Sequence, residues 1–492
     1  MNIAEAKEYI KDTVSLYLQK DEFGDYRIPV VRQRPIFLLG APGIGKTAVM
    51  SQVASELNIA LVSYSMTHHT RQSALGLPFI EQKEFDGNSY RVSEYTMSEI
   101  ISSVYDTMEE SGVKEGILFL DEINCVSETL YPSMLQFLQV KVFGKHQVPE
   151  GWVIVTAGNP PEFNKSVREF DVVTLDRLKV MEVEADYPAW TKYANDRNIH
   201  GAILNFLDTN KDYFYMVETT AYGKNYVTAR GWEDLSEIIT LYEENHKKVT
   251  QSLIGQYIKH DTVVKEFAAY YDLYNKYKRQ YDVEMIFEGK LDENTKEAAK
   301  KAPMDERLAL TGMLADRMKS ELKDVMHQAD LLQEVRPGMQ KLLEAKDTLQ
   351  KQELVRTFIQ ARKQLMNQKA KAGSLTALEK THNKRMLAFY QEMNQALEAG
   401  TQEKEFFNQK VKQLQEKVLE KQTRMEHLFA AMSEIFGEES NEMLVLVTEL
   451  TMHTDAARFL ATFRSAAYET YNSLLMVGDR NENLRKEIMD LL

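Results

Sequence analysis

The sequence predicts an α/β fold, in which a parallel β-sheet lies between two layers of helices and is followed by a helical lid and a long all-α C-terminal region. Residues 1–182 alternate short apolar strands with helices, whereas residues 183–284 are mainly helical in pattern and residues 285–492 almost wholly so. Alternation of strands and helices is typical of parallel sheets, because each parallel crossover needs a long connection. We therefore expect three domains, at residues 1–182, 183–284 and 285–492.

Five apolar segments of strand length support the predicted sheet. They lie at residues 36–39, 60–64, 117–120, 152–157 and 178–183. Open parallel sheets bind ligands at the carboxyl ends of their strands. The residues that follow these strands are therefore the first candidates for a functional site.

The first strand runs directly into a glycine-rich loop that ends in Lys46 and Thr47, before a helix predicted at residues 47–57. This is the phosphate-loop (Walker A) pattern, in which glycines let backbone N–H groups point at phosphate oxygens. The helix N-terminus adds the positive end of its dipole. Lys46 can reach the outer phosphates and the Thr47 hydroxyl can ligate Mg²⁺. The predicted nucleotide-binding residues are Gly40, Ala41, Pro42, Gly43, Ile44, Gly45, Lys46, Thr47 and Ala48. The alternative is a tight strand-to-helix turn that happens to carry Lys-Thr.

Two acids follow the third strand and form a Walker B pattern. Hydrolysis of a phosphoanhydride needs a residue that holds the metal and a residue that positions the attacking water. Asp121 suits the metal, directly or through a water, and Glu122 suits polarising the water. An acid pair after a strand can also be a helix cap. After a phosphate loop, we favour the hydrolytic pair.

Three further polar residues complete a predicted ATPase site. Asn159 follows the fourth strand, where it can contact the attacking water and the terminal phosphate. Arg177, at a helix end beside a strand, could point into a neighbouring copy's nucleotide, where a permanently charged guanidinium suits the transition state. Arg168 competes for this role and ranks lower. Thr228 is a candidate cap for a helix whose first turn carries Arg230, facing back toward the nucleotide.

The order of these parts resembles the AAA+ ATPases, and within them the MoxR-type group, over roughly residues 25–280. The most specific pieces are residues 40–47, 118–122, 157–160, 175–178 and 228–230, and residues 71–78 also resemble that group. The resemblance implies that Asn159 is sensor 1, Arg177 the arginine finger and Arg230 sensor 2, acting in cis or in trans. It also implies ATP with Mg²⁺, a ring that is usually a hexamer, and a von Willebrand factor A-domain partner in chaperone-like remodelling or metal insertion.

Two hairpins are predicted inside the sheet domain as insertions. Residues 79–95 carry Asp86-Gly87-Asn88 at their centre, and residues 140–148 carry Phe143-Gly144-Lys145; both are turn signals. The first hairpin matches the helix-2 insert of the MoxR-type group in its placement. Insertions on a ring-forming ATPase often face the pore or the substrate.

The C-terminal third is longer than a minimal MoxR-type core and matches no module, so its role stays open. Helix breaks are predicted at residues 336–338, 371–374, 399–401 and 436–437, and Thr376 with Glu379 resembles a capping box. Apolar stripes at residues 375–397 and 411–435 have helical spacing. Two antiparallel helices joined at Gly400 could bury these stripes against each other as a coiled-coil-like arm. A compact bundle is the equal alternative. The aromatics from Phe267 to Tyr277 predict one packed helix face.

Composition limits the classes of function. The net charge of −14 and the pI near 5.4 disfavour a dedicated nucleic-acid binder. No apolar stretch of membrane-spanning length is present, the N-terminus lacks the pattern of a secretion signal, and Cys125 is the only cysteine, so we expect a cytoplasmic protein. We interpret Cys125 as a small residue beside the acids rather than a reactive thiol. His68 and His69 are interpreted as loop residues, because no further ligands stand at metal spacing.

Three functions remain. The first is an ATP-hydrolysing ring motor that remodels a partner protein, and the second is a scaffold that ATP only assembles. The third, a nucleic-acid translocase, is least favoured and rests on Lys141, Lys145 and His146 of the second hairpin. The sequence does not disclose the substrate.

Overall fold

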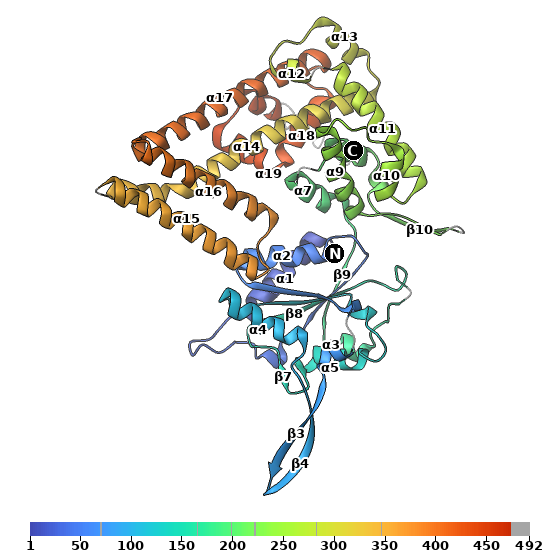
Figure 1. Cartoon of the computed structure of the whole chain (residues 1–492). Helices are drawn as coiled ribbons and strands as arrows, with labels where there is room; N and C mark the ends of the chain where they lie inside the picture. Colours follow the sequence, from blue (N-terminus) through green and yellow to red (C-terminus); the bar gives the residue numbers. More distant parts are fainter. Residues whose placement is uncertain are drawn as a thin grey trace, which may run out of the picture. The chain divides into compact units, whose positions relative to one another are not determined.

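The computed structural model describes residues 1–473, except residues 69, 70, 165, 198, 221, 222, 282 and 346. The chain divides into two compact units (Figure 1). The first contains residues 1–189 together with residues 357–387, and the second contains residues 190–356 and the chain from residue 388 onward. No helix of the described residues combines the length and apolar character needed to cross a bilayer.

The first unit is built on a five-stranded parallel sheet with the strand order β2-β5-β8-β1-β9. The strands are β1 (Ile36–Gly40), β2 (Ala60–Ser65), β5 (Gly116–Asp121), β8 (Trp152–Gly158) and β9 (Lys179–Val183). All five predicted strands are therefore present. The predicted fold class is confirmed, since helices flank this sheet and a long all-α region follows.

Helices cover both faces of the sheet, as the handedness of the crossovers requires. The chain crosses from β1 to the edge strand β2 in one direction and then returns through β5 and β8 in the other. Because parallel crossovers are right-handed, α2 must lie on one face, and α4 and α5 on the opposite face. Side chains of α4 and α5 share one core cluster with Phe37, Val62 and Leu118. The helices of this unit are α1 (Ile3–Tyr17), α2 (Lys46–Leu57), α3 (Arg71–Leu75), α4 (Glu99–Ser111), α5 (Tyr131–Val140) and α6 (Val172–Leu175).

Both predicted hairpins are present. The strands β3 (Pro78–Phe85) and β4 (Asn88–Tyr95) pair antiparallel around Asp86 and Gly87, which both have positive φ, as a tight hairpin turn requires. This hairpin projects from the sheet of the first unit (Figure 1). The second is much shorter and pairs β6 (Val142–Phe143) with β7 (His146–Gln147).

The second unit is almost wholly helical, but it contains one hairpin, β10 (Met216–Thr220) with β11 (Gly223–Val227), that the sequence did not predict. Its first helices include α11, whose aromatic face is buried as predicted, with Phe267 fully enclosed and Tyr274 nearly so. These helices are α7 (Tyr187–Arg197), α8 (Gly201–Thr209), α9 (Ala229–Glu244), α10 (Gln251–Tyr257), α11 (Asp261–Gln280), α12 (Val283–Phe287) and α13 (Glu293–Lys301).

Five longer C-terminal helices test the predicted breaks, and one break is wrong. The helix α14 (Met304–Glu344) continues through Pro337. Its neighbours Val335 and Met339 are buried, so packing overrides the cost of a proline that lacks an N–H. The other three breaks separate α15 (Thr348–Lys371), α16 (Ala377–Glu398), α17 (Glu403–Phe436) and α18 (Asn441–Met452), and α19 (Thr454–Phe463) follows.

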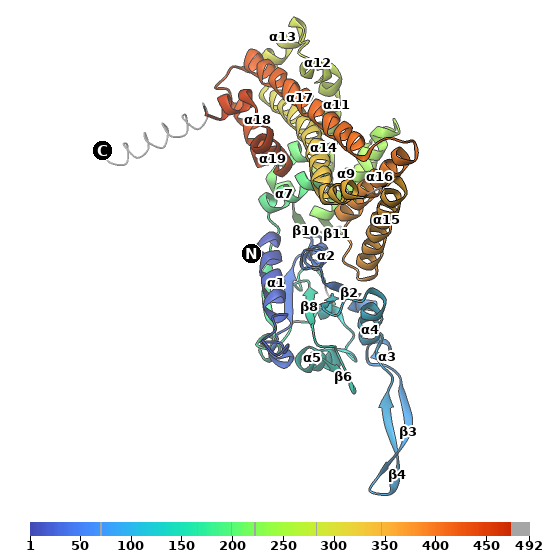
Figure 2. The same ribbon diagram turned by 90° about the vertical axis from the view of Figure 1, so that its left-hand side faces the viewer.

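The apolar stripe of α17 packs differently from the prediction. Its buried residues, from Val418 to Ile435, lie along α14 rather than α16, and both views show α14 and α17 side by side (Figure 2). Arg424 of α17 pairs with Glu321 of α14 at 2.8 Å. Contacts between α16 and α17 occur near the Gly400 turn, where the Phe389 and Phe406 rings lie 5.5 Å apart. The expected antiparallel pair is therefore found only at that end.

Candidate nucleotide-binding site

The glycine loop has the backbone that the phosphate-loop pattern requires. Gly43 and Gly45 have φ values of 77° and 97°, which residues other than glycine rarely adopt. The helix α2 begins at the next residue, Lys46. A Cβ on Gly40 would lie 2.5 Å from the Val183 carbonyl oxygen of the neighbouring strand β9. The glycine loop therefore packs closely against the sheet, and α2 begins directly after the loop.

Lys46 joins the loop to a second strand. Its Nζ donates to the Gly40 and Ala41 carbonyl oxygens at 2.6 and 2.7 Å and to Asn159 Oδ1 at 2.9 Å. Only 8% of Lys46 is exposed, and its Nζ is bonded to these three acceptors. The structure thus brings together two residues that the sequence places 113 positions apart.

The two predicted metal ligands are hydrogen-bonded to each other. Thr47 Oγ1 donates to Asp121 Oδ2 at 2.7 Å. Both are oxygen ligands, and Mg²⁺ commonly takes only one or two protein ligands while keeping waters and substrate phosphates. The pair therefore fits a magnesium site beside a phosphate loop. Among the described residues, no cluster of three or more His, Cys, Asp or Glu side chains could hold a metal by itself.

Glu122 is held by two hydroxyls that sequence reasoning missed. Its Oε2 accepts from Ser65 Oγ at 3.1 Å and from Thr67 Oγ1 at 3.0 Å, and its backbone has a left-handed φ of 55°. Ser65 ends β2 directly opposite Asp121 in the sheet register. The available sequence signal was a pair of hydroxyl residues, Ser65 at the end of β2 and Thr67 just beyond it. The strand β2 pairs with β5, which leads into the acid pair.

Asn124 is a second residue that sequence reasoning missed. Its Nδ2 donates to the Asn159 backbone oxygen at 2.8 Å, and a Cβ on Gly158 would lie 2.5 Å from its Oδ1. Gly158 therefore makes room for Asn124, and Asn124 fixes the backbone that presents Asn159. The sequence signal was a glycine immediately before Asn159 and an amide two residues after the acid pair.

These polar groups gather at the carboxyl ends of β1, β2, β5 and β8. Residues 36–175 match the AAA family model, described as the ATPase family associated with various cellular activities. The match covers the phosphate loop, the acid pair and Asn159, and these residues are referred to below as the AAA domain.

The comparison with curated proteins finds no match. Among solved structures, the chain is similar to the crystal structure of NtrX from Brucella abortus in complex with ADP, with 15% sequence identity and a TM-score of 0.24. That match covers 43% of this chain and 42% of NtrX, so the chain spans less than half of that protein's length.

The two candidate finger arginines lie in different surroundings. Arg168, in the AAA domain, is ion-paired with Glu128 and lies over the Tyr131 ring at 5.8 Å. Arg177 is exposed just beyond α6, beside the exposed side chains of Val172 and Val173. Arg177 is therefore better placed to reach outward, and its action on a neighbouring copy stays a prediction.

Arg230 lies in the second unit, in the first turn of α9. As predicted, Thr228 caps this helix, since its side chain accepts from the Gly231 N–H at 3.2 Å. Arg230 is exposed. Its sensor 2 role toward the nucleotide stays a prediction.

Cys125 lies in the short turn after Glu122. Burial, with the charges of Glu122 and Asp121, raises the pKa of its thiol, and Asn164 Nδ2 lies 3.4 Å from its sulfur. A raised pKa disfavours the reactive thiolate, which agrees with the interpretation of Cys125 as a small packing residue. The His68 side chain and His69 lie outside the described part of the chain.

The basic residues of the second hairpin are engaged within the protein. Lys141 is 3% exposed, and its Nζ donates to the Val30 carbonyl oxygen at 2.7 Å, while burial lowers its pKa to about 8. Lys145 pairs with Glu94, and His146 Nε2 lies 3.2 Å from the Tyr95 carbonyl oxygen. These contacts remove the best sequence support for a nucleic-acid surface.

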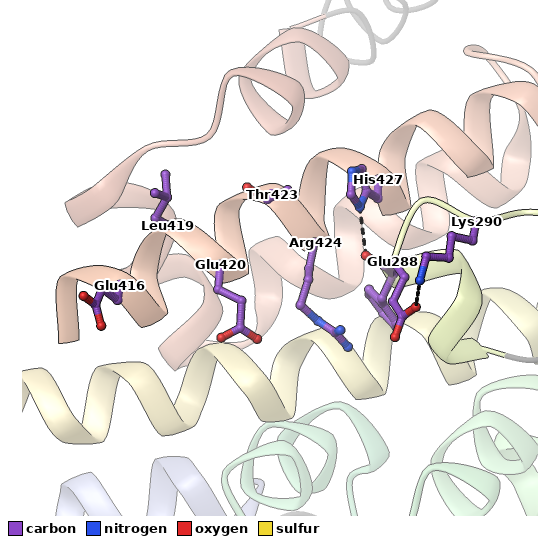
Figure 3. Close-up of a pocket in the computed structure, with 9 residues that line it drawn as sticks. Glu288, Lys290, Glu416, Leu419, Glu420, Thr423, Arg424 and His427 are labelled. Carbon is purple, nitrogen blue, oxygen red and sulfur yellow. Dashed lines mark hydrogen bonds and ion pairs between the residues drawn. The ribbon is translucent and has the colours of Figure 1, made fainter. Parts of the chain in front are cut away.

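The second unit contains a hollow of about 590 Å³ between α17 and the segment after α12 (Figure 3). Two pairs of its lining groups bond to each other: Lys290 pairs with Glu288 at 2.8 Å, and His427 Nδ1 lies 2.9 Å from the Phe287 carbonyl oxygen. None of the predicted site residues lines this hollow.

Proposed function

We propose that this protein is a MoxR-type AAA+ ATPase that hydrolyses ATP in a ring of identical subunits and uses the energy to remodel a partner protein. The observation that carries the proposal is the pair of contacts from Lys46 to Asn159 and from Thr47 to Asp121. Three separate segments with the right chemistry meet at one edge of a parallel sheet, inside a region that matches an AAA family model.

The residues divide the work of hydrolysis. The phosphate loop and Lys46 bind the triphosphate, and Thr47 with Asp121 would hold Mg²⁺, which neutralises phosphate charge when bound. Glu122 accepts a proton from the attacking water, and Asn159 orients that water. Arg177 of a neighbouring subunit balances charge on the transferred phosphoryl group.

The resting position of Glu122 supports a regulated reaction. Its carboxylate accepts two hydroxyl hydrogen bonds from Ser65 and Thr67. Movement of the end of β2 would change those bonds, and the base would then be released or withheld. The von Willebrand factor A-domain partner and the hexamer are part of the proposal through the family resemblance alone.

The decisive experiment measures steady-state ATP turnover of the wild type, Glu122→Gln and a matched control, Glu110→Gln, on the exposed part of α4. Loss of the general base should lower turnover by about 10²–10⁴-fold, with ATP binding retained, while the control keeps wild-type turnover. Equal turnover in all three proteins would refute the hydrolytic mechanism. Glu122→Gln protein that binds ATP and keeps full cellular activity would favour the ATP-assembled scaffold instead.

A further inference from the structure

The turn that joins α15 to α16 belongs to the first unit, although it lies far along the chain in the helical region. Residues 357–387 pack with residues 1–189, and the remaining ends of both helices belong to the second unit. Ala372, in this turn, is 1% exposed and is a member of the same core cluster as Ala60 and Val62 of β2. The turn is therefore part of the core of the first unit.

A backbone hydrogen bond fixes the turn to the edge of the sheet. The Leu61 N–H of β2 donates to the Ala372 carbonyl oxygen at 2.7 Å. The preceding N–H group, that of Ala60, donates to the carbonyl oxygen of Glu115, the residue just before β5. It therefore points toward β5, whereas the N–H of Leu61 points away from the sheet. Because β2 is the edge strand, its outward-facing groups need a partner or a cover. The turn supplies one.

Gly373 makes this approach possible. Its φ is +69°, and a Cβ added to it would lie 2.4 Å from the Leu61 carbonyl oxygen. A side chain is thus excluded both by conformation and by contact with backbone. Gly400, at the turn between α16 and α17, offers a matched comparison: its φ is +86°, but nothing lies within 4 Å of its added Cβ.

Side chains extend the contact to α2. Glu379, in the first turn of α16, accepts from Lys369 of α15 at 2.7 Å and closes the predicted capping box with Thr376. It also accepts a hydrogen bond from Ser55 of α2. Burial raises the pKa of Glu379, but the bonds from Lys369, Ser55 and Thr376 outweigh it, so the net pKa is lowered and the carboxylate is charged.

The two elements that the turn contacts adjoin the predicted site: one carries Lys46 and Thr47, and the other carries a hydroxyl that bonds to Glu122. The helix α2 begins with Lys46 and Thr47, and β2 ends at Ser65, which with Thr67 holds Glu122. We infer that residues 372–379, which form the turn after α15 and the first turn of α16, are a positioning element of the ATPase site that sets the geometry of β2 and α2. This inference rests on the proposed ATP hydrolysis.

The test compares Gly373→Ala with Gly400→Ala in the full chain. Turnover is expressed per bound nucleotide, with the amount of bound ADP measured by calorimetry, so that a loss of folded protein does not count as a loss of catalysis. Gly373→Ala should lower kcat by about tenfold with KM for ATP little changed, because small displacements of catalytic groups are costly. Hydrogen exchange of peptides covering β2 should be about tenfold faster. Gly400→Ala should match the wild type in both measurements.

A second pair of variants serves if Gly373→Ala does not fold. Glu379→Gln weakens the contact with α2, and Glu392→Gln, on the same helix, breaks an ion pair with Lys410 outside the first unit. Only Glu379→Gln should lower kcat. Faster exchange in β2 with wild-type kcat would overturn the positioning role. Wild-type protein without ATP turnover would instead refute the proposed function, and this inference with it.

Discussion

Charged side chains cluster in both units of this molecule, but on different kinds of backbone. In the AAA domain, Lys46 begins α2 directly after Gly45, which has a left-handed φ, and Asp121 ends β5 directly before Glu122, whose φ is also left-handed. In the second unit, Lys319 lies in the middle of the regular helix α14 and pairs with Asp316 at 2.8 Å and with Glu449 at 2.7 Å.

The two clusters also differ in what surrounds the charges. Lys319 is 5% exposed, and although burial favours its neutral form, the charges of Asp316 and Glu449 raise its pKa, so it is held as an ammonium. Asp121 and Glu122 remain half exposed at the sheet edge. A buried group with fixed partners stabilises one conformation, whereas strained, accessible groups can change partners during a reaction. The comparison teaches that accessible groups on irregular backbone, rather than buried pairs on a regular helix, are the better candidates for chemistry.

The largest effect on ATP turnover is expected from a substitution of Arg177. This residue would extend the proposed catalytic cluster across two subunits. Arg177→Ala should lower turnover by ~10³–10⁵-fold, the range measured for arginine fingers in GTPases. Mixing Arg177→Ala with Glu122→Gln, each inactive alone, should restore part of the wild-type turnover, because some interfaces then combine an intact base with an intact finger. A mixture as inactive as its components would show that Arg177 does not act in trans. Arg168→Ala, tested in the same way, decides between the two arginines.

A substitution in the buried cluster of Lys319, Asp316 and Glu449 should lower stability. Lys319→Met leaves Asp316 and Glu449 without their shared cation, which should lower the free energy of unfolding of the second unit by about 3–5 kcal/mol. This free energy is measured by urea unfolding, with hydrogen exchange of α14 as the readout. Lys301→Met is the control, since the Lys301–Glu297 pair is exposed to solvent and should contribute little to stability. Equal effects of the two substitutions would contradict the structural role of Lys319.

The pH dependence of the second unit sharpens the comparison further. Burial, followed by the charge of Lys319, lowers the pKa of His453 from 6.5 to about 4. Between these values the unfolded chain binds more protons than the folded one, so stability is lost as the pH falls from 6.5 toward 4. From pH 7 to 5 this loss should be about 2 kcal/mol.

His453→Asn tests this dependence while preserving the helix cap. His453 Nδ1 accepts from the Ala456 N–H at the start of α19, and asparagine is an equally good N-cap. Hydrogen exchange of α19 at pH 7 and pH 5 should show a smaller difference in the variant than in the wild type. The same difference in both proteins would place the titration elsewhere.

The smallest effect is expected at the second hairpin. Glu94 pairs with Lys83 as well as with Lys145, so Lys145→Ala should change stability by less than about 1 kcal/mol. DNA or RNA should not stimulate ATP turnover of either protein at low salt. Salt-sensitive stimulation that Lys145→Ala abolishes would restore the nucleic-acid translocase.

The sequence alone determined the sheet and the members of its candidate site that lie in recognisable local patterns. A glycine loop, an acid pair and a strand followed by Asn159 each have a local signature, and the carboxyl ends of parallel strands converge by geometry. The local signals at Ser65, Thr67 and Asn124 were too weak to assign them to the site, because their roles depend on which strands are neighbours and on the space left by Gly158.

The helical region shows the complementary limit. The turns at Gly373, Gly400 and Gly437 could be predicted from the sequence, because the residue after a helix often has a positive φ, which favours glycine. The continuation through Pro337, the pairing of α17 with α14 and the contact of Ala372 with β2 were decided by the tertiary structure. Each depends on burial against a segment distant in sequence, and the local pattern of an apolar stripe carries no information about which partner will cover it.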